Sequence, residues 1–266
     1  MGQKIRVLIH GALGKMGQEV LGAVHRDPDL EAVAGIDITG EAKELLLPDS
    51  SSKIPFSTNL ESIIEHCSPD VLVDFTKASA TMNAVRIAAK HQISLVLGTT
   101  GLSATNLKEI EDLCHKANLG AVVAPNFALG AAVMIHLAKV AAKFFDYAEI
   151  IEMHHEEKLD APSGTALSTA REMLNARGKP FTHVTAAMES LAGSRGSNFE
   201  GVALHSIRLP GLLAHQEVIL GAAGQTLTIR HDTTSRACFM PGIILAIKRV
   251  IDLKEAAFGL DKVLEL

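Results

Sequence analysis

Two histidines, two glutamates and a lysine occupy the five consecutive positions from His154 to Lys158, where a β-rich run ends. An imidazole can give a proton near neutral pH, and a lysine ammonium acts as an acid when its pKa is lowered. The following Pro162–Thr165 segment is typical of a helix start, with Ser163 or Thr165 as its cap. The first N–H groups of such a helix can bind an anion such as a carboxylate. The segment therefore predicts a proton donor beside an anion clamp.

Two other interpretations of this segment stay open from the residues alone. Histidine and glutamate are common metal ligands, so His154, His155, Glu156 and Glu157 would suit a metal-dependent hydrolase. Adjacent strand residues point to opposite faces, however, which makes it hard for the two histidines to share one ion. Alternatively, a polar cluster in a loop is simply a solvated turn. An isolated histidine such as His10 has no such neighbours and is expected to be structural.

A glycine-rich turn, GALGKMG at residues 11–17, joins a β-rich run to a helical pattern. Glycines keep such a turn tight and let the backbone approach a pyrophosphate, which a helix N-terminus attracts. The spacing is GxxGxxG rather than GxGxxG, but an acidic residue, Asp37, ends the next β-rich run 20 positions after Gly17. A carboxylate there can accept hydrogen bonds from the ribose hydroxyls. We therefore predict a dinucleotide site, the alternative being an ordinary tight turn between a strand and a helix.

The residues after Asp37 bear on which nucleotide is bound. Ile38 and Thr39 offer no cation for a 2′-phosphate, and the nearest candidates are Lys15 and Lys43. NADH is therefore favoured, with dual use of NADPH left open.

The order of the predicted strands and helices that must position these residues changes near Asn126. Before it, nearly continuous apolar β-rich runs alternate with helical patterns, which predicts a doubly wound parallel sheet of the Rossmann-like α/β class. The expected strands are 5–10, 31–37, 71–75, 93–97 and 121–124, and the expected helices are 16–25, 79–90 and 104–117. After it, the pattern predicts an α+β unit with a mixed sheet. Its expected helices are 129–145 and 163–176, its expected strands 148–154, 202–208, 216–220 and 226–231, with a polar loop at 189–201 and a last helix at 239–252.

Composition limits the class of protein. The 266 residues are 47% hydrophobic and 21% charged, with a formal charge of −5, which is typical of a globular protein and not of a nucleic-acid binder. Cys67, Cys114 and Cys238 show no CxxC spacing, so neither a zinc ribbon nor a disulfide framework is expected. Since no apolar run approaches the ~20 residues of a membrane span, we expect a cytoplasmic protein without nucleic-acid or membrane partners.

Taken together, these motifs resemble the 4-hydroxy-tetrahydrodipicolinate reductase (dihydrodipicolinate reductase) family of diaminopimelate and lysine biosynthesis. The most specific is the HHxxKxDAPSGTA pattern at residues 154–166. The resemblance also covers GALGKMG, VDFT at 73–76, GTTG at 98–101, APNFALG at 124–130 and RLPGLLAHQEV at 208–218. Members often carry an arginine directly after the acidic residue, where Ile38 and Thr39 stand here.

The resemblance implies an NAD(P)H-dependent reductase of a small cyclic dicarboxylate. His154 is expected to be the catalytic acid/base, and Lys158 a second proton donor that also binds substrate. His155, Gly164 and Thr165 are expected to bind the substrate carboxylates. The residues expected at the nucleotide are Gly11, Ala12, Leu13, Gly14, Lys15, Met16, Asp37, Phe75, Gly98, Thr99, Thr100, Ala124, Pro125, Asn126 and Phe127, and no metal is expected.

The resemblance also implies that the last helix returns to the first domain and that the second domain forms a homotetramer. The expected division is a dinucleotide-binding domain at 1–127 and 239–266, and a substrate-binding and oligomerisation domain at 128–238. A non-catalytic NAD(H)-sensing module is the alternative function, although it leaves the His154–Lys158 cluster without a role.

Overall fold

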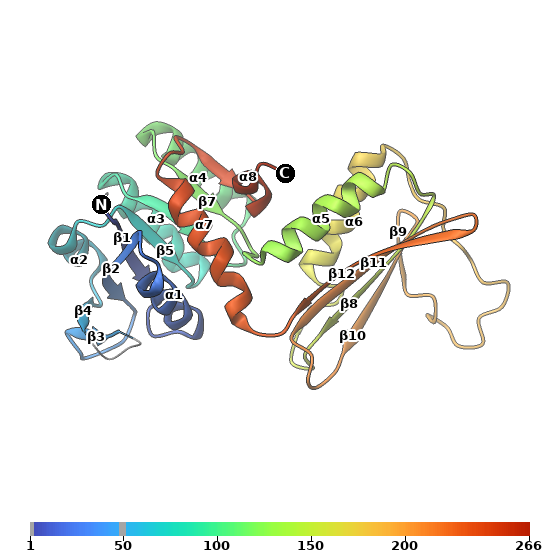
Figure 1. The fold of residues 1–266 in the computed structure, drawn as a ribbon, viewed down its shortest axis with the longest axis horizontal. Coiled ribbons are helices and arrows are strands. Elements are labelled where there is room, and N and C mark those ends of the chain that lie inside the picture. Colours follow the sequence, from blue (N-terminus) through green and yellow to red (C-terminus); the bar gives the residue numbers. More distant parts are fainter. Residues whose placement is uncertain (1–2, 48–51) are drawn as a thin grey trace. The chain divides into compact units, whose positions relative to one another are not determined.

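A computed structural model describes residues 3–47 and 52–266 of the chain (Figure 1). The chain divides into two compact units. One unit comprises Met1–Leu129 with Arg236–Leu266, and the other comprises Gly130–Ser235.

The first unit is built on an eight-stranded sheet with the order β13-β7-β6-β5-β1-β2-β4-β3. Its strands are parallel except β3, which runs antiparallel to β4. Every residue of β5 and β6 is buried, which explains why these strands are almost uninterrupted apolar sequence. The strands are β1 (Ile5–His10), β2 (Leu30–Ile36), β3 (Glu44–Leu46), β4 (Lys53–Ser57), β5 (Val71–Asp74), β6 (Ser94–Leu97), β7 (Ala121–Val123) and β13 (Ala256–Phe258).

Helices cover both faces of this sheet, as the alternating pattern predicted (Figure 1). Helices α2 (Leu60–Cys67), α3 (Ala78–Lys90) and α4 (Ala104–Ala117) share one apolar core with the strands. Helix α1 (Lys15–Arg26) packs on β1, β2 and α7 (Met240–Val250), and α7 packs on β5, β6 and β7. A 3₁₀ turn, Arg236–Phe239, precedes α7, and α8 (Leu260–Leu264) packs against α7 and β13. The Rossmann-like doubly wound fold is thereby confirmed.

The second unit carries a five-stranded mixed sheet with the order β12-β11-β8-β10-β9, in which only β10 and β8 are parallel. Alternate residues of the central strands face α5 (Leu129–Ala141) and α6 (Gly164–Arg177), and these form an apolar core around Ile150, Met173 and Val218. The strands are β8 (Tyr147–His154), β9 (Ser197–Phe199), β10 (Val202–Arg208), β11 (Ala214–Ala222) and β12 (Gln225–Thr233).

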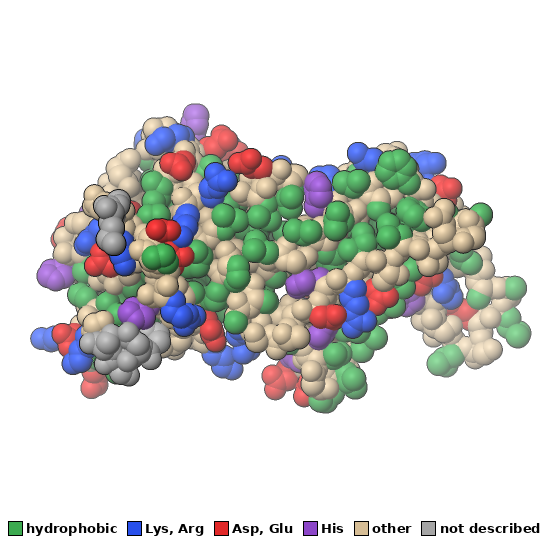
Figure 2. All heavy atoms as spheres, viewed as in Figure 1, with side chains coloured by type: hydrophobic (Ala, Val, Ile, Leu, Met, Phe, Trp, Pro, Cys, Tyr) green, Lys and Arg blue, Asp and Glu red, His purple; other side chains and the backbone are tan. Residues whose placement is uncertain are grey.

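Helix α5 is apolar on two sides. Its buried residues include Met134 and Ala138, whereas Val133 and Leu137 are 41% and 47% exposed. Figure 2 shows hydrophobic side chains gathered along this helix. The outer side of α5 is therefore an apolar surface of the single chain.

The structure differs from the predicted helices and strands in two ways: it contains short elements that were not predicted, and one helix ends earlier than predicted. The short elements β3, β4, β9, β13, α2 and α8 were not expected, because three to eight residues carry too little periodicity. In particular, β9 lies inside the stretch 189–201 that was expected to be one loop. Helix α5 stops at Ala141 rather than at residue 145. The guanidinium of Arg177 in α6 donates to the carbonyls of Ala142 and Phe145 and so holds the turn that follows α5.

Among the described residues, none of the helices combines the length and apolar character needed to cross a membrane.

Candidate functional site

The turn between β1 and α1 is held by its own backbone. Gly11 has a φ of +83°, and its N–H donates to the carbonyl of Ile36 at 2.8 Å. A Cβ on Gly17 would lie 2.0 Å from the carbonyl oxygen of Gly11, so the helix approaches the turn more closely than any side chain would permit. Gly14 caps α1 without a side chain, and the first turn of the helix carries no acidic residue. The N–H groups of the Gly11–Gly14 turn are used within the fold, whereas those that begin α1 at Lys15 and Met16 receive no side-chain cap and can bind an anion.

Asp37 lies directly after β2 and turns its carboxylate toward the glycine turn. One oxygen accepts the N–H of Leu13 at 3.0 Å, and the other accepts the N–H of Ile38 at 2.8 Å. Each oxygen keeps lone pairs for further donors such as ribose hydroxyls. Asp37 and Ile38 also line a hollow of about 510 Å³ within this unit, together with His10 and Asn83. These features fit the adenosine half of a dinucleotide.

A buried polar network lies under the strand ends of the first unit. Asp74 is fully buried and accepts hydrogen bonds from the Thr76 N–H and the Thr99 hydroxyl, both at 2.8 Å, and from the Thr81 hydroxyl at 3.1 Å. Its second oxygen lies 2.7 Å from Nδ1 of His10. Burial raises the pKa of Asp74, but the hydrogen bonds from His10 and Thr76 outweigh it and leave that pKa below its ordinary value. The network ties the 98–101 loop to the end of β1.

The two loops expected at the nicotinamide have aromatic neighbours. A Cβ on Gly98 would lie only 2.0 Å from Cε1 of the Phe75 ring, so a larger residue at position 98 would force the ring to move. The rings of Phe75 and Phe127 pack with centroids 5.9 Å apart. Phe127 itself is only 2% exposed, which makes its side chain part of the core. The Asn126 side chain accepts the N–H of Ala128 at 2.9 Å and so shapes the second loop.

The end of β8 in the second unit carries a buried carboxylate, Glu152, which is 1% exposed. One of its oxygens lies 2.5 Å from Nδ1 of His154, and Arg208 donates to both oxygens, at 3.0 and 2.8 Å. Burial raises the pKa of Glu152, but the hydrogen bonds from His154 and Arg208 prevail and lower it to about 2. The carboxylate is therefore ionised at neutral pH, and His154 is held at the strand end.

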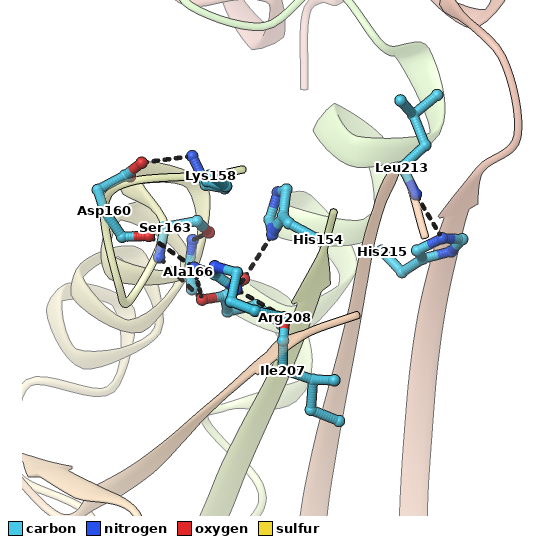
Figure 3. Close-up of polar contacts among 10 residues, drawn as sticks. His154, Lys158, Asp160, Ser163, Ala166, Ile207, Arg208, Leu213 and His215 are labelled. Atoms are coloured by element: carbon cyan, nitrogen blue, oxygen red, sulfur yellow. Dashed lines mark hydrogen bonds and ion pairs between the residues drawn. The ribbon is translucent and has the colours of Figure 1, made fainter. Parts of the chain in front are cut away.

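Lys158 lies in the turn that follows β8. Its Nζ is 2.6 Å from Oδ1 of Asp160, and this lysine lowers the pKa of the Asp160 carboxyl. Arg208 also donates to the backbone carbonyl of Asp160 at 2.6 Å. The dashed lines in Figure 3 follow these contacts from Lys158 through Asp160 to Arg208, and from Arg208 to His154 by way of the Glu152 carboxylate. Both predicted proton donors thus belong to one charged cluster.

The N-terminus of α6 opens beside this cluster. Ser163 is the cap: its hydroxyl accepts the N–H of Ala166 at 3.1 Å, and its own N–H donates to Glu152 at 3.2 Å. Thr165, the other candidate cap, instead lies within the first turn. A Cβ on Gly164 would meet nothing within 4 Å. There is consequently open space directly at the first helical N–H groups.

The site includes residues that sequence reasoning missed, namely Glu152, Arg208 and Asp74. Glu152 could have been found, because it lies two positions before His154 on a strand and therefore on the same face. Arg208 could not, since the pairing of β10 with β8 alone places it opposite His154. In residues 3–47 and 52–266 no group of three or more His, Cys, Asp or Glu side chains is arranged to hold a metal ion.

Comparison with known proteins gives one consistent result. Residues 5–127 match the family model described as dihydrodipicolinate reductase, N-terminus, and residues 130–264 match the model described as dihydrodipicolinate reductase, C-terminus. A 4-hydroxy-tetrahydrodipicolinate reductase of Dehalococcoides mccartyi is 55% identical over 262 residues, covering 98% of this chain and 99% of its own. One of Syntrophomonas wolfei is 46% identical over 268 residues, covering 99% and 100%.

Among solved structures, the dipicolinate-bound dihydrodipicolinate reductase from Paenisporosarcina sp. TG-14 is similar to this chain. It shares 39% sequence identity and a TM-score of 0.88, over 98% of this chain and 99% of its own.

Proposed function

The chain belongs to the dihydrodipicolinate reductase family, and on that premise we propose the following reaction and site. With NAD(P)H as reductant, 4-hydroxy-2,3,4,5-tetrahydrodipicolinate is reduced to 2,3,4,5-tetrahydrodipicolinate with loss of water, in the diaminopimelate route to lysine. The observation that carries this function is the cluster of His154 and Lys158 at the open N-terminus of α6. Glu152 links His154 to Ser163 at the start of α6, so a proton donor lies beside an anion site. Reduction of a dicarboxylate requires both.

The first unit holds the nucleotide. The segment from Gly11 to Met16 wraps the pyrophosphate, with the N–H groups at the start of α1 as the donors, and Asp37 binds the adenosine ribose. Three loops flank the nicotinamide; they contain Phe75, Gly98 to Thr100, and Ala124 to Phe127. The close approach at Gly17 and the two-sided anchoring of Asp37 support this assignment.

The second unit binds the substrate through its two carboxylates. The N–H groups of Gly164 and Thr165, together with the Thr165 hydroxyl, bind one carboxylate at the helix N-terminus. His155 and the Lys158 ammonium bind the dianion by charge and hydrogen bonds. The related Paenisporosarcina reductase binds dipicolinate, a planar dicarboxylate, and this supports the same substrate class here.

His154 acts as the general acid. Loss of the 4-hydroxyl group as water first leaves a conjugated cyclic imine. When bound, the nicotinamide supplies a hydride to carbon 4 of that dehydrated ring. The added electron pair leaves negative charge in the conjugated system, and His154 quenches that charge by donating a proton. Lys158 stabilises the charge before the proton arrives and is free to do so once substrate displaces Asp160 from its Nζ.

NADH is used at least as well as NADPH. Asp37 places a negative charge where a 2′-phosphate would lie, and Ile38, which is 73% exposed, supplies no compensating cation. Replacing Ile38 by arginine would raise the NADPH-to-NADH ratio of kcat/KM, with Thr39→Ala as a control that adds no charge. An unchanged ratio would refute this explanation of cofactor choice.

The protein assembles as a homotetramer through the face of the second sheet that α5 and α6 leave bare. The apolar residues of that face are Ile151, Met153, Ile207 and Ile219, and Ile207 is 41% exposed in the single chain. Apolar surface of this kind is typical of subunit contacts. Ile207→Asp is expected to lower the mass measured by light scattering, whereas a wild type that is monomeric by the same measurement would refute the proposal.

One coupled assay tests the reaction itself. The upstream synthase generates the unstable hydroxy-imine substrate, and the absorbance of NADH and NADPH is followed in parallel reactions. Oxidation of either nucleotide only in the presence of the synthase product is expected. If the nucleotide binds but is not oxidised, the protein is a nucleotide sensor and not a reductase.

A further inference from the structure

The buried carboxylate of Glu152 has no part in the reaction described above. It lies two residues before His154 on β8, is 1% exposed, and is held by Nδ1 of His154, both terminal nitrogens of Arg208, the N–H of Ser163 and the side chain of Ser206. Burying a charge is costly unless each lone pair finds a donor, and here donors from four residues surround one carboxylate. This arrangement calls for a role beyond packing.

We propose that Glu152 is a positioning residue for His154. Its carboxylate keeps a proton on Nδ1 of His154, so that Nε2 is the nitrogen that donates to substrate. The carboxylate also favours the charged imidazolium, and Arg208 weakens that preference. The inference rests on the proposed role of His154 as the acid.

The first argument is the tautomer. An ionised carboxylate can only accept hydrogen bonds, so the His154 nitrogen at 2.5 Å must be the donor in both the neutral and the charged imidazole. The pKa of Glu152, lowered to about 2, keeps the carboxylate in that form throughout the neutral range. Proton exchange with substrate is then left to Nε2, for which the described part of the chain supplies no partner.

The second argument is the balance of charge around the ring. Glu152 favours the imidazolium, whereas Arg208, which hydrogen-bonds to the same carboxylate from β10, opposes it. From the loop after β8, Lys158 and Asp160 face the cluster as a pair at 2.6 Å, and from β11 the residue opposite His154 is the uncharged Ala214. Removing Glu152 or Arg208 should therefore shift the His154 titration in opposite directions.

The chain contains a matched control on the same strand. Glu149 also pairs with one arginine and one histidine, Arg195 at 2.5 Å and His205 at 2.9 Å, but it lies on the other face of β8. Glu149→Gln removes an equivalent carboxylate without touching the His154 cluster.

The experiment is a ¹⁵N NMR titration of histidine-labelled full-length protein, with the His154 signals assigned by their loss in His154→Gln. In the wild type, the neutral ring is expected to carry its proton on Nδ1. Glu152→Gln should move the midpoint of the His154 titration to lower pH and mix the two tautomers, because an amide can donate as well as accept. Arg208→Gln should move that midpoint to higher pH, and Glu149→Gln should leave it where it lies in the wild type.

Turnover gives an independent readout. Glu152→Gln is expected to reduce kcat by roughly 10- to 100-fold, the loss found when the partner that orients a metal-binding histidine is removed. KM should stay within about threefold because the substrate clamp is intact. Glu152→Asp keeps the negative charge. The midpoint of its His154 titration should therefore lie closer to that of the wild type than the midpoint of Glu152→Gln does, even where the shorter side chain limits kcat. If Glu152→Gln proves unstable, Arg208→Gln and Glu152→Asp still test the direction in which the His154 titration shifts.

Three results would overturn the inference. They are a wild-type ring protonated on Nε2 when neutral, a His154 titration that Glu152→Gln leaves unchanged, and shifts of the same sign for Glu152→Gln and Arg208→Gln, which would indicate general damage. None of them depends on reductase activity, so a failure of the proposed reaction is recognised separately by the coupled assay.

Discussion

Gly164→Ala should separate the stability of the second unit from its capacity to bind substrate. Gly164 is the first residue of α6, and its added Cβ would meet no atom within 4 Å. Alanine is favoured over glycine within a helix by roughly 0.5–1 kcal/mol, so the variant is expected to be as stable as the wild type or slightly more stable. At about 2–4 °C per kcal/mol for a chain of this size, Tm should rise by ~1–4 °C.

The same methyl group is expected to damage binding, because the open space it enters is where the substrate carboxylate is proposed to lie. Loss of one hydrogen bond to a charged group costs about 1.5–3 kcal/mol, which corresponds to a rise of roughly 10- to 150-fold in KM. Differential scanning calorimetry and initial rates in the coupled assay measure the two effects on the same preparation.

Gly178 at the other end of α6 provides the control. Its φ is +73° and a Cβ there would also meet nothing within 4 Å, so Gly178→Ala should cost about 1–2 kcal/mol of stability through backbone strain and leave KM unchanged. A Gly164→Ala enzyme that folds and keeps the wild-type KM would refute the helix N-terminus as the carboxylate site.

Three further predictions follow from the described contacts. His154→Gln should lower kcat by about 10²–10⁴ with KM nearly kept, and steady-state kinetics showing full turnover would refute its role as the acid. Gly17→Ala forces backbone apart at a 2.0 Å approach and should weaken NADH binding, measured by fluorescence, far more than Gly14→Ala, whose Cβ meets the Gly11 oxygen at 3.2 Å; equal effects would contradict this packing argument. The pKa of Glu152 falls from 4.5 to about 2 on folding, so the ionised form stabilises the fold by on the order of 3 kcal/mol above pH ~4.5, and this stabilisation is lost as the pH falls toward 2. Urea unfolding between pH 6 and 3 should therefore be more pH-dependent for the wild type than for Glu152→Gln, and parallel curves would contradict that linkage.

The catalytic candidates could be found in the sequence because local chemistry marks them. His154, Lys158 and the Ser163 cap lie within ten positions, and the strand and the helix that carry them have clear periodicity. The glycine turn proposed for the nucleotide is marked in the same way, since its glycines and Asp37 follow consecutive strands. These patterns involve residues that are close together in the chain, so they can be recognised without knowledge of the tertiary fold.

The residues that support the site depend on strand pairing instead. Arg208 reaches Glu152 across 56 positions, and His10 reaches Asp74 across 64. The sequence that starts at Arg208 is part of the family resemblance, but it does not show what Arg208 contacts, because those contacts arise from the register of β10 against β8. Similarly, the turn after α5 is held by Arg177 of another helix, which donates to the carbonyl of Ala142.

The sequence by itself determined the fold class, and it marked the glycine turn proposed for the nucleotide and the His154–Lys158 segment proposed to donate protons, because each is encoded by residue types at short, regular spacing. Only the tertiary structure decided which charges surround His154 and which cap opens α6, because burial and hydrogen bonding between distant strands set those interactions, and a linear pattern carries no information about register.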